Sequence, residues 1–140
     1  MGLLEECKKI VERTAKKYGI SYALLFGSYA SKRNWKESDI DIAVKLKNPH
    51  KKFKEKIRLM NRIAGEIERK KGVETDVIFL NDADTGLKFE IFRTGKILYY
   101  DNYDKFVNDK SAAIGEYLDF NFWAMPLHKK VYESVLHGRK

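Results

Sequence analysis

The 140-residue sequence contains no glutamine, a single cysteine and only two prolines. Cys7 cannot form an internal disulfide, which favours a reducing compartment, so we expect a cytoplasmic protein. No apolar run approaches the roughly 20 residues that a membrane-spanning helix requires, and the membrane is therefore not expected as a partner. The first ten residues, MGLLEECKKI, also lack the basic segment and the apolar stretch of a secretory signal. These absences disfavour both secreted and membrane proteins.

The composition is that of a globular domain. Hydrophobic residues make up 44% of the chain and aromatic residues 13%, which is enough for a hydrophobic core. At this length a single domain over residues 1–140 can bury roughly two-thirds of its unfolded surface. The net charge of +8 is compatible with a solvated, lysine-rich surface or with attraction to a polyanion. Because the basic residues are spread along the whole chain, we favour the solvated surface.

Hydrophobic periodicity predicts an alternation of helices and strands. The predicted helices cover 3–18, 49–71, 84–94 and 103–137, the last interrupted near Pro126, and the predicted strands cover 21–26, 38–46, 73–80 and 96–100. In the second helix, the residues expected to face inward are Phe53, Ile57, Met60, Ile63, Ala64 and Ile67. We therefore predict an α/β (α+β) fold, with a small mixed sheet of about four strands flanked by helices. Its core covers about residues 20–100, followed by a helical C-terminal extension over about 101–140.

Three aspartates stand inside predicted strands, where a buried carboxylate costs free energy unless it is paired or binds a metal. Asp39 and Asp41 are separated by one residue, so they point to the same side of a strand, roughly 6.5 to 7 Å apart. Asp76 lies in the middle of the third strand, VETDVIFL. If the second and third strands are neighbours, the three carboxylates can surround one or two Mg²⁺ ions, which keep coordination positions for water and phosphate. The alternative is that Asp39 caps a turn and Asp41 pairs with a lysine.

A Gly-Ser pair ends the first predicted strand. Gly27 lets the backbone approach a ligand closely, and Ser28, at the start of a short helix, offers a hydroxyl and free backbone N–H groups to a phosphate. Ser28 alone is more typical of an ordinary turn, so its assignment depends on its spacing from the aspartates. Together, the turn and the aspartates predict a site for a metal-bound nucleoside triphosphate.

The segment GSYASKRNWKESDID resembles the signature of the nucleotidyltransferase superfamily, in which Gly-Ser is followed after ten residues by Asp-x-Asp. This superfamily includes DNA polymerase beta and kanamycin nucleotidyltransferase. The small size and the strand order are similar to its minimal nucleotidyltransferase (MNT) branch, whose members are often paired with HEPN toxins. The resemblance covers about residues 20–100. It departs after the Gly-Ser, where relatives often carry Arg-Gly, and this leaves Lys32 and Arg33 as the alternatives for a phosphate contact.

The resemblance implies a nucleotidyltransferase fold and a Mg²⁺-dependent reaction in which an acceptor hydroxyl attacks the α-phosphorus of ATP or another triphosphate. It implies that Asp39, Asp41 and Asp76 hold two Mg²⁺ ions, that Gly27 and Ser28 bind the nucleotide, and that Asp76 helps to deprotonate the acceptor. The MNT branch favours a tyrosine of a partner HEPN toxin as acceptor, so the protein would be an antitoxin that acts by AMPylation. The alternatives are a small-molecule acceptor such as an aminoglycoside, and a non-catalytic antitoxin that masks its toxin.

Two further predictions concern surfaces. An RNA-binding role for the helix over 49–71 would require its lysines and arginines to lie along one face, but they cover most of its polar circumference. Nucleic acid is therefore not expected as a partner. The stretch FNFWAMPLHKKVY, residues 120–132, is either part of the core or an apolar patch that binds a partner, and an oligomer formed through the C-terminal region is compatible with the second alternative.

Overall fold

The computed structural model describes residues 2–27 and 40–124, with side chains described up to Phe120. Within these ranges the helices are α1 (Leu3–Tyr18), α2 (Phe53–Lys71), α3 (Thr85–Thr94) and α4 (Tyr103–Ala124), with a short 3₁₀ helix over Leu80–Asp82. The strands are β1 (Ile20–Phe26), β2 (Ile40–Leu46), β3 (Thr75–Phe79) and β4 (Lys96–Tyr100). The predicted order of helices and strands is confirmed. None of the described helices is long and apolar enough to cross a membrane.

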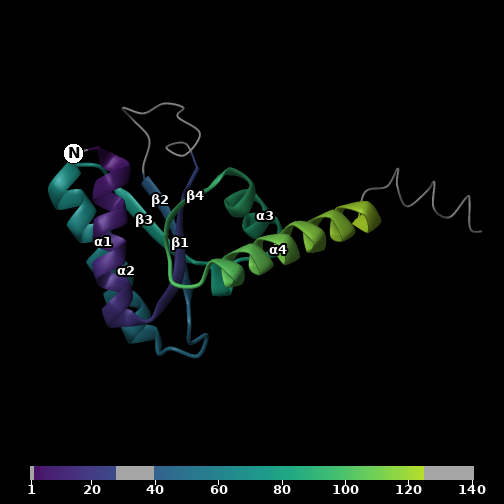
Figure 1. Ribbon diagram of the computed structural model, residues 1–140, viewed down its shortest axis with the longest axis horizontal. Coiled ribbons are helices and arrows are strands. Elements are labelled where there is room, and N and C mark those ends of the chain that lie inside the picture. Colours follow the sequence, from purple (N-terminus) through teal and green to yellow (C-terminus); the bar gives the residue numbers. More distant parts are fainter. Residues whose placement is uncertain (1, 28–39, 125–140) are drawn as a thin grey trace, which may run out of the picture.

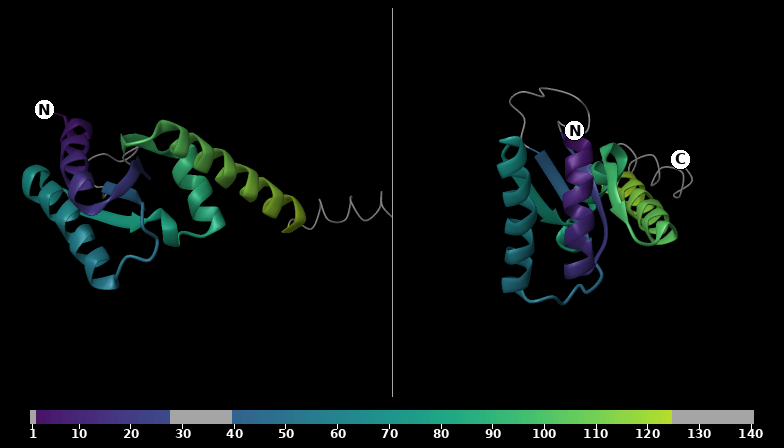
Figure 2. Two further views of the ribbon diagram at one scale, coloured as in Figure 1. Left: turned by 60° about the horizontal axis from the view of Figure 1, so that its bottom comes forward. Right: turned by 60° about the vertical axis from the view of Figure 1, so that its left-hand side comes forward.

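The four strands form one mixed sheet in the order β3-β2-β1-β4. β1 pairs antiparallel with both β2 and β4, whereas β2 and β3 are parallel. The parallel pair is connected through α2, because neighbouring parallel strands need a long crossover connection. α1 and α2 lie together on one face of the sheet, and α3 and α4 lie on the other (Figures 1 and 2). The predicted mixed sheet flanked by helices is therefore confirmed.

The sheet separates two hydrophobic cores, because successive side chains of a strand point to opposite faces. Ile40 and Ile42 of β2 belong to the core under α1 and α2, where they are buried in the same cluster as Ile63 of α2. Leu24 of β1 belongs to the core on the other face, with Phe106 of α4. The face to which a strand residue points is thus fixed by its position in this alternation.

α2 begins four residues later than predicted, and its buried face is rotated relative to the prediction. Ile63 and Ile67 are buried as expected, together with Leu59. Phe53 is 75% exposed and Ile57 is 37% exposed, so the prediction that both face the core is wrong. At 100° per residue, Ile57 lies about 120° around the helix from the centre of the stripe formed by Leu59, Ile63 and Ile67. Phe53, in the first turn, also lies off this stripe.

The predicted C-terminal helix is present as α4, whose second half extends away from the sheet (Figure 1). Leu118 and Phe120 are 56% and 62% exposed, so the beginning of the aromatic stretch is not part of the core. The remaining side chains of that stretch, and the predicted interruption at Pro126, lie outside the described part of the chain.

The buried thiol of Cys7 predicts a pH dependence of stability. Cys7 is fully buried in the core under α1 and α2. This burial, reinforced by the neighbouring Glu6 carboxylate, raises the pKa of its thiol from 9.0 to about 11. In that range the unfolded chain loses the proton while the folded protein keeps it, so the free energy of unfolding should fall as the pH rises from about 9 to about 11.

The Cys7 contribution to this fall is at most about 3 kcal/mol. Denaturant titrations at several pH values across this range measure it, with Cys7→Ala as the comparison. The fall should be smaller in the Cys7→Ala protein, and an equal fall in both proteins would assign it to another group.

Candidate active site

The end of β1 and the beginnings of β2 and β3 meet at one end of the sheet. Because β1 and β2 are antiparallel, Phe26 pairs with Asp41, and because β2 and β3 are parallel, Asp41 pairs with Asp76. Gly27 follows directly after β1. The topology thus brings together Gly27, Asp41 and Asp76, the three predicted site residues that lie within the described ranges.

Asp41 and Asp76 point to the same face of the sheet. Ile40 and Ile42, on either side of Asp41, and Val77, directly after Asp76, are buried under α1 and α2. The two carboxylates therefore project from the opposite face, and their strands are about 4.8 Å apart. Asp41 is half-buried and Asp76 is exposed. The carboxylate pair is consequently accessible to a ligand from solvent.

Gly27 lies against the Asp41 carboxylate. Its φ of +79° is in the left-handed region, and a Cβ atom at this position would be 2.5 Å from Oδ2 of Asp41. Only glycine satisfies both the backbone angle and the space available. The sequence predicted a close approach of the backbone to a ligand, and the structure adds a close approach to the carboxylate. The missing side chain therefore leaves room for the Asp41 carboxylate beside the end of β1.

Asp41 and Asp76 have the chemistry of magnesium ligands. Carboxylate oxygens suit Mg²⁺, which is held in proteins by one or two carboxylates while its other positions take water or phosphate oxygens. Two carboxylates side by side repel each other, and a cation between them removes this cost. Within residues 2–27 and 40–124, no three side chains of His, Cys, Asp or Glu form a metal-binding group. Of the three predicted ligands, Asp41 and Asp76 therefore lie side by side within the described residues and suit Mg²⁺.

The other residues of the predicted site lie outside the described ranges. They are Asp39, which is the third predicted metal ligand, Ser28, and the two alternatives for a phosphate contact, Lys32 and Arg33. The predictions for these four residues therefore stand on the sequence alone.

A polar network that the sequence analysis missed lies further along the same face of the sheet. Tyr22 of β1 pairs with Lys45 of β2, and the Tyr22 hydroxyl donates a hydrogen bond of 2.7 Å to Oδ2 of Asp109 in α4. Lys105 donates to the other oxygen of Asp109 at 3.1 Å. The alternation that includes Asp41 also reaches Lys45, but nothing in the sequence indicates that Asp109 lies above it. The bond from Tyr22 attaches α4 to the sheet, and the bond from Lys105, within α4, holds the Asp109 carboxylate in place.

Tyr22 and Lys45 also line a pocket of about 120 Å³ under α3 and α4. Ligand sites usually have volumes of roughly 300–1,000 Å³, so this pocket is too small for a nucleotide. Burial lowers the pKa of the Lys45 ammonium, although the nearby Asp109 carboxylate opposes the shift. Burial and the hydrogen bond to Asp109 raise the pKa of the Tyr22 hydroxyl. Tyr22 therefore stays protonated at neutral pH and acts as a hydrogen-bond donor in this network.

The mixed sheet with carboxylates at adjoining strand ends defines a class of proteins. Residues 8–104 match the model of the family described as polymerase beta, nucleotidyltransferase. The chain belongs to this family, and the predicted nucleotidyltransferase fold is confirmed. The matched range contains Gly27, Ser28, Asp39, Asp41 and Asp76, the five residues predicted to bind the nucleotide or the metal ions. No curated protein sequence matches the chain.

Within this class, the chain is similar to solved MNT structures. A structure of a toxin–antitoxin with AMP-PNP has 19% identity and a TM-score of 0.64, covering 92% of this chain and 98% of that one. A structure of the tri-AMPylated Shewanella oneidensis HEPN toxin in complex with MNT antitoxin has 17% identity and a TM-score of 0.63, covering 95% and 98%. A structure of the toxin–antitoxin MntA–HepT has 16% identity and a TM-score of 0.62, covering 94% and 98%. These matches confirm the resemblance to the MNT branch at the level of the fold.

Proposed function

We propose that this protein is a Mg²⁺-dependent nucleotidyltransferase that transfers AMP from ATP to a tyrosine hydroxyl of a partner HEPN toxin, and thereby acts as its antitoxin. The observation that carries the proposal is the pairing of Asp41 with Asp76 on adjoining parallel strands, beside Gly27. Two neighbouring carboxylates do not stabilise the fold, because they repel each other, whereas they can hold the metal ion of a triphosphate. The related structures support the choice of nucleotide and acceptor, since one contains AMP-PNP and another a tri-AMPylated HEPN toxin.

Each site residue has a role in this proposal. Asp39 and Asp41 hold the metal of the triphosphate, and Asp76 joins them at a second metal position. Gly27 and Ser28 receive the phosphates, because a residue without a side chain and a hydroxyl beside free N–H groups both suit an anion. When bound, Mg²⁺ neutralises charge on the phosphates and favours ionisation of the acceptor hydroxyl.

The proposed reaction exchanges one phosphorus–oxygen bond for another. The tyrosine oxygen forms a bond to the α-phosphorus of ATP, and the bond from that phosphorus to the oxygen bridging the α- and β-phosphates breaks. Pyrophosphate leaves with the electron pair of the broken bond. The hydroxyl proton passes to Asp76, whose exposed side chain can release it to water. The products are AMP-tyrosine and pyrophosphate.

Labelled ATP tests this reaction directly. With Mg²⁺ and a HEPN protein as the candidate partner, label at the α-phosphate should appear on the HEPN protein, and label at the γ-phosphate should not. Mass spectrometry should locate AMP on tyrosine, and a chelator of divalent cations should stop the transfer because the carboxylates then lack their metal. Transfer of the γ-label would indicate a kinase, and transfer of the α-label to an added small molecule such as an aminoglycoside, but not to the HEPN protein, would assign the acceptor to the small-molecule class.

A further inference from the structure

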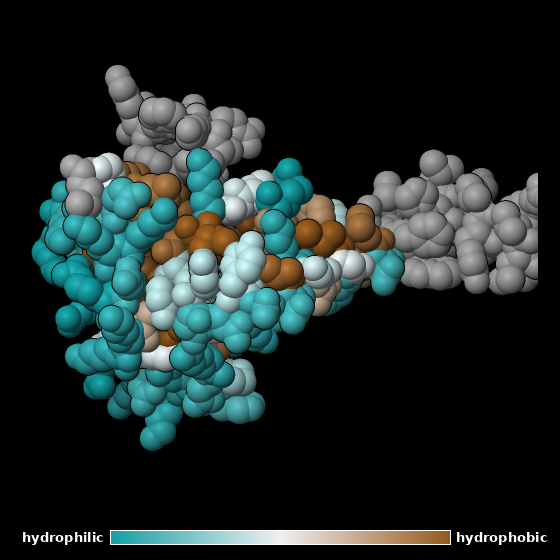
Figure 3. Space-filling model, viewed as in Figure 1, coloured by the Kyte–Doolittle hydropathy of each residue, from teal (hydrophilic) through white to brown (hydrophobic). Residues whose placement is uncertain are grey.

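α1 and α2 carry most of the net charge of the protein. α1 has five basic and three acidic residues and α2 has seven basic and three acidic residues, which gives +6 of the net charge of +8. The two helices lie side by side on the face of the sheet opposite Asp41 and Asp76 (Figure 2). In the space-filling view, hydrophilic residues cover the region of α1, whereas hydrophobic ones gather towards α3 and α4 (Figure 3). The positive charge is therefore concentrated on one side of the molecule.

Two hollows run along this side, and we call them together the basic groove. The first has a volume of about 540 Å³ and is lined by Glu6, Lys9, Glu12, Arg13, Lys16 and Lys70. The second has a volume of about 560 Å³ and is lined by Tyr18, Arg58, Asn61, Arg62, Glu66 and Arg69. The Glu66 carboxylate connects them, because it accepts hydrogen bonds from Arg13 of α1 at 2.9 Å and Arg62 of α2 at 3.1 Å. The groove thus contains seven basic and three acidic side chains.

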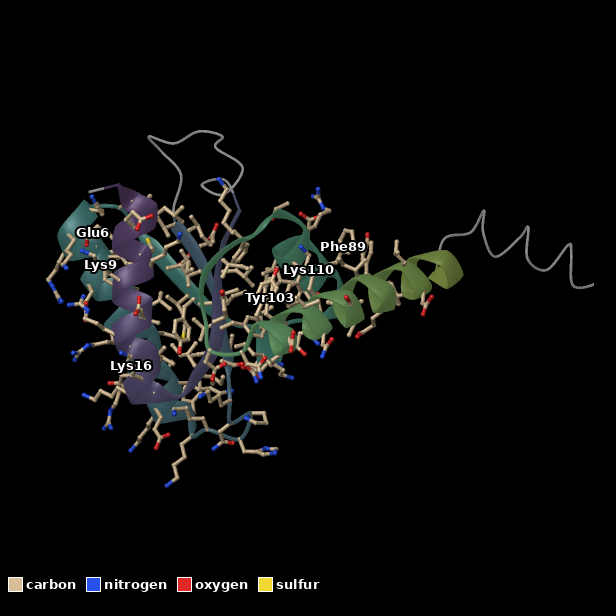
Figure 4. All side chains as sticks on the ribbon, in the orientation of Figure 1. Glu6, Lys9, Lys16, Phe89, Tyr103 and Lys110 are labelled. Carbon is tan, nitrogen blue, oxygen red and sulfur yellow. The ribbon has the colours of Figure 1, made fainter. Side chains whose placement is uncertain are left out.

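Four cations of the basic groove are available to a ligand. Lys9, Lys16, Arg58 and Arg69 are all exposed, and none of them forms an ion pair within the described part of the chain. Figure 4 shows Lys9 and Lys16 on α1, at the side of the molecule where the groove lies. On α1 the groove cations Lys9, Arg13 and Lys16 follow one another at intervals of about one turn, or about 5.4 Å. On α2 Arg58 and Arg62 are one turn apart, and the adjacent Arg69 and Lys70 lie about two turns further along the helix. Positive charges that extend along both helices suit an elongated ligand that carries several negative charges.

We propose that the basic groove binds single-stranded RNA through its phosphate backbone. Successive phosphates of a nucleic-acid chain can contact the cations along both helices, and neutralising the phosphates releases counterions, which drives binding. An acidic protein fits less well, since the cores of protein interfaces are rich in apolar and aromatic anchors, and Tyr18 is the one aromatic side chain among the described residues that line the groove. The Tyr18 hydroxyl and the Asn61 amide can also hydrogen-bond to 2′-hydroxyl groups, which DNA lacks.

This surface could not be recognised from either helix alone. The cations of α2 are distributed around its polar circumference, which is why its sequence did not predict an RNA-binding face. Packing against α1 selects Arg58, Arg62 and Arg69 and aligns them with Lys9 and Lys16 on the same surface. The groove results from the pairing of two helices that are about 40 residues apart in the sequence.

Fluorescence anisotropy with a labelled single-stranded RNA oligonucleotide, at several salt concentrations, tests the proposal. The groove variant replaces Lys9, Lys16, Arg58 and Arg69 with glutamine, and all four positions are exposed, so the fold should be retained. Its Kd should rise at least about tenfold at low salt, and the slope of log K against log salt should fall by about 2 to 3 units. Circular dichroism checks that the variant is folded.

A charge-matched variant distinguishes the groove from general attraction to a basic protein. Lys52, Lys54, Arg93 and Lys96 are also exposed but do not line the groove, and replacing them with glutamine removes the same charge. This control should bind RNA within about twofold of the wild type. Equal losses in the two variants, or no loss in the groove variant, would overturn the proposal.

Two further ligands test the choice of RNA. A single-stranded DNA of the same sequence should bind more weakly, and equal affinity would overturn the assignment to RNA. Polyglutamate should not compete at an equal concentration of charges, and if it displaced the RNA, the groove would be assigned to an acidic protein. These outcomes do not depend on the proposed AMP transfer, because its carboxylates lie on the other face of the sheet.

Discussion

Replacing Asp76 with alanine should lower the rate of AMP transfer by about three orders of magnitude or more, while the Kd for ATP changes only a few-fold. In the proposed site, Asp76 provides a ligand for the second metal position and takes the proton from the acceptor hydroxyl. Asp39 and Asp41 still hold the metal of the triphosphate, so binding is retained. Single-turnover transfer measured beside equilibrium ATP binding separates the two effects. Because Asp76 is exposed, its replacement should not unfold the protein.

Asp104→Ala is the matched control, because Asp104 is also an exposed aspartate but lies in the first turn of α4. This variant should transfer AMP at close to the wild-type rate. Neutralisation of the HEPN toxin in cells then distinguishes catalysis from masking. If AMPylation is what neutralises the toxin, Asp76→Ala should fail to protect cells and Asp104→Ala should protect them. Full protection by a catalytically inactive Asp76→Ala protein would falsify the catalytic hypothesis and favour an antitoxin that only masks its toxin.

Much of the fold could be predicted because the alternation of side chains along a strand is a local property of the sequence. Alternation along β2 correctly separated Asp41 and Ala43 from Ile40 and Ile42, since this pattern depends only on the two-residue period of a strand. The register between strands depends on contacts over long sequence distances. The sequence could therefore predict that Asp41 and Asp76 lie together only if their strands are neighbours in the sheet. The strand order shows that they are.

Packing between helices and sheet was less predictable. The inward face assigned to α2 included Phe53 and Ile57, because an amphipathic pattern alone does not determine which part of a broad apolar stripe contacts the sheet. The bond from Tyr22 to Asp109 was missed for a related reason. Such a contact joins residues of β1 and α4, and neither residue carries a local signal of its partner.

Replacing Gly27 with alanine should weaken the binding of Mg²⁺-ATP at least about tenfold, which corresponds to roughly 1.4 kcal/mol. The added Cβ atom would lie 2.5 Å from Oδ2 of Asp41, so the carboxylate must move away from its place beside the strand end. It would also fill the space into which a phosphate is proposed to enter. A second cost arises from φ of +79°, since the left-handed conformation is unfavourable for alanine by about 1–2 kcal/mol. Alanine at this position should therefore reduce both the stability and the affinity for ATP.

Gly72→Ala is the control that separates these two costs. Gly72 follows α2 with φ of +66°, but a Cβ atom there would have no described heavy atom within 4 Å. This variant should lose about 1–2 kcal/mol in free energy of unfolding from the backbone conformation and should bind ATP as the wild type does. Calorimetric titration with Mg²⁺-ATP and denaturant unfolding of both variants measure the two quantities. If Gly27→Ala loses stability to the same extent as Gly72→Ala but binds ATP normally, then the turn after β1 forms no part of the nucleotide site, and the space beside Asp41 serves only to pack the sheet end.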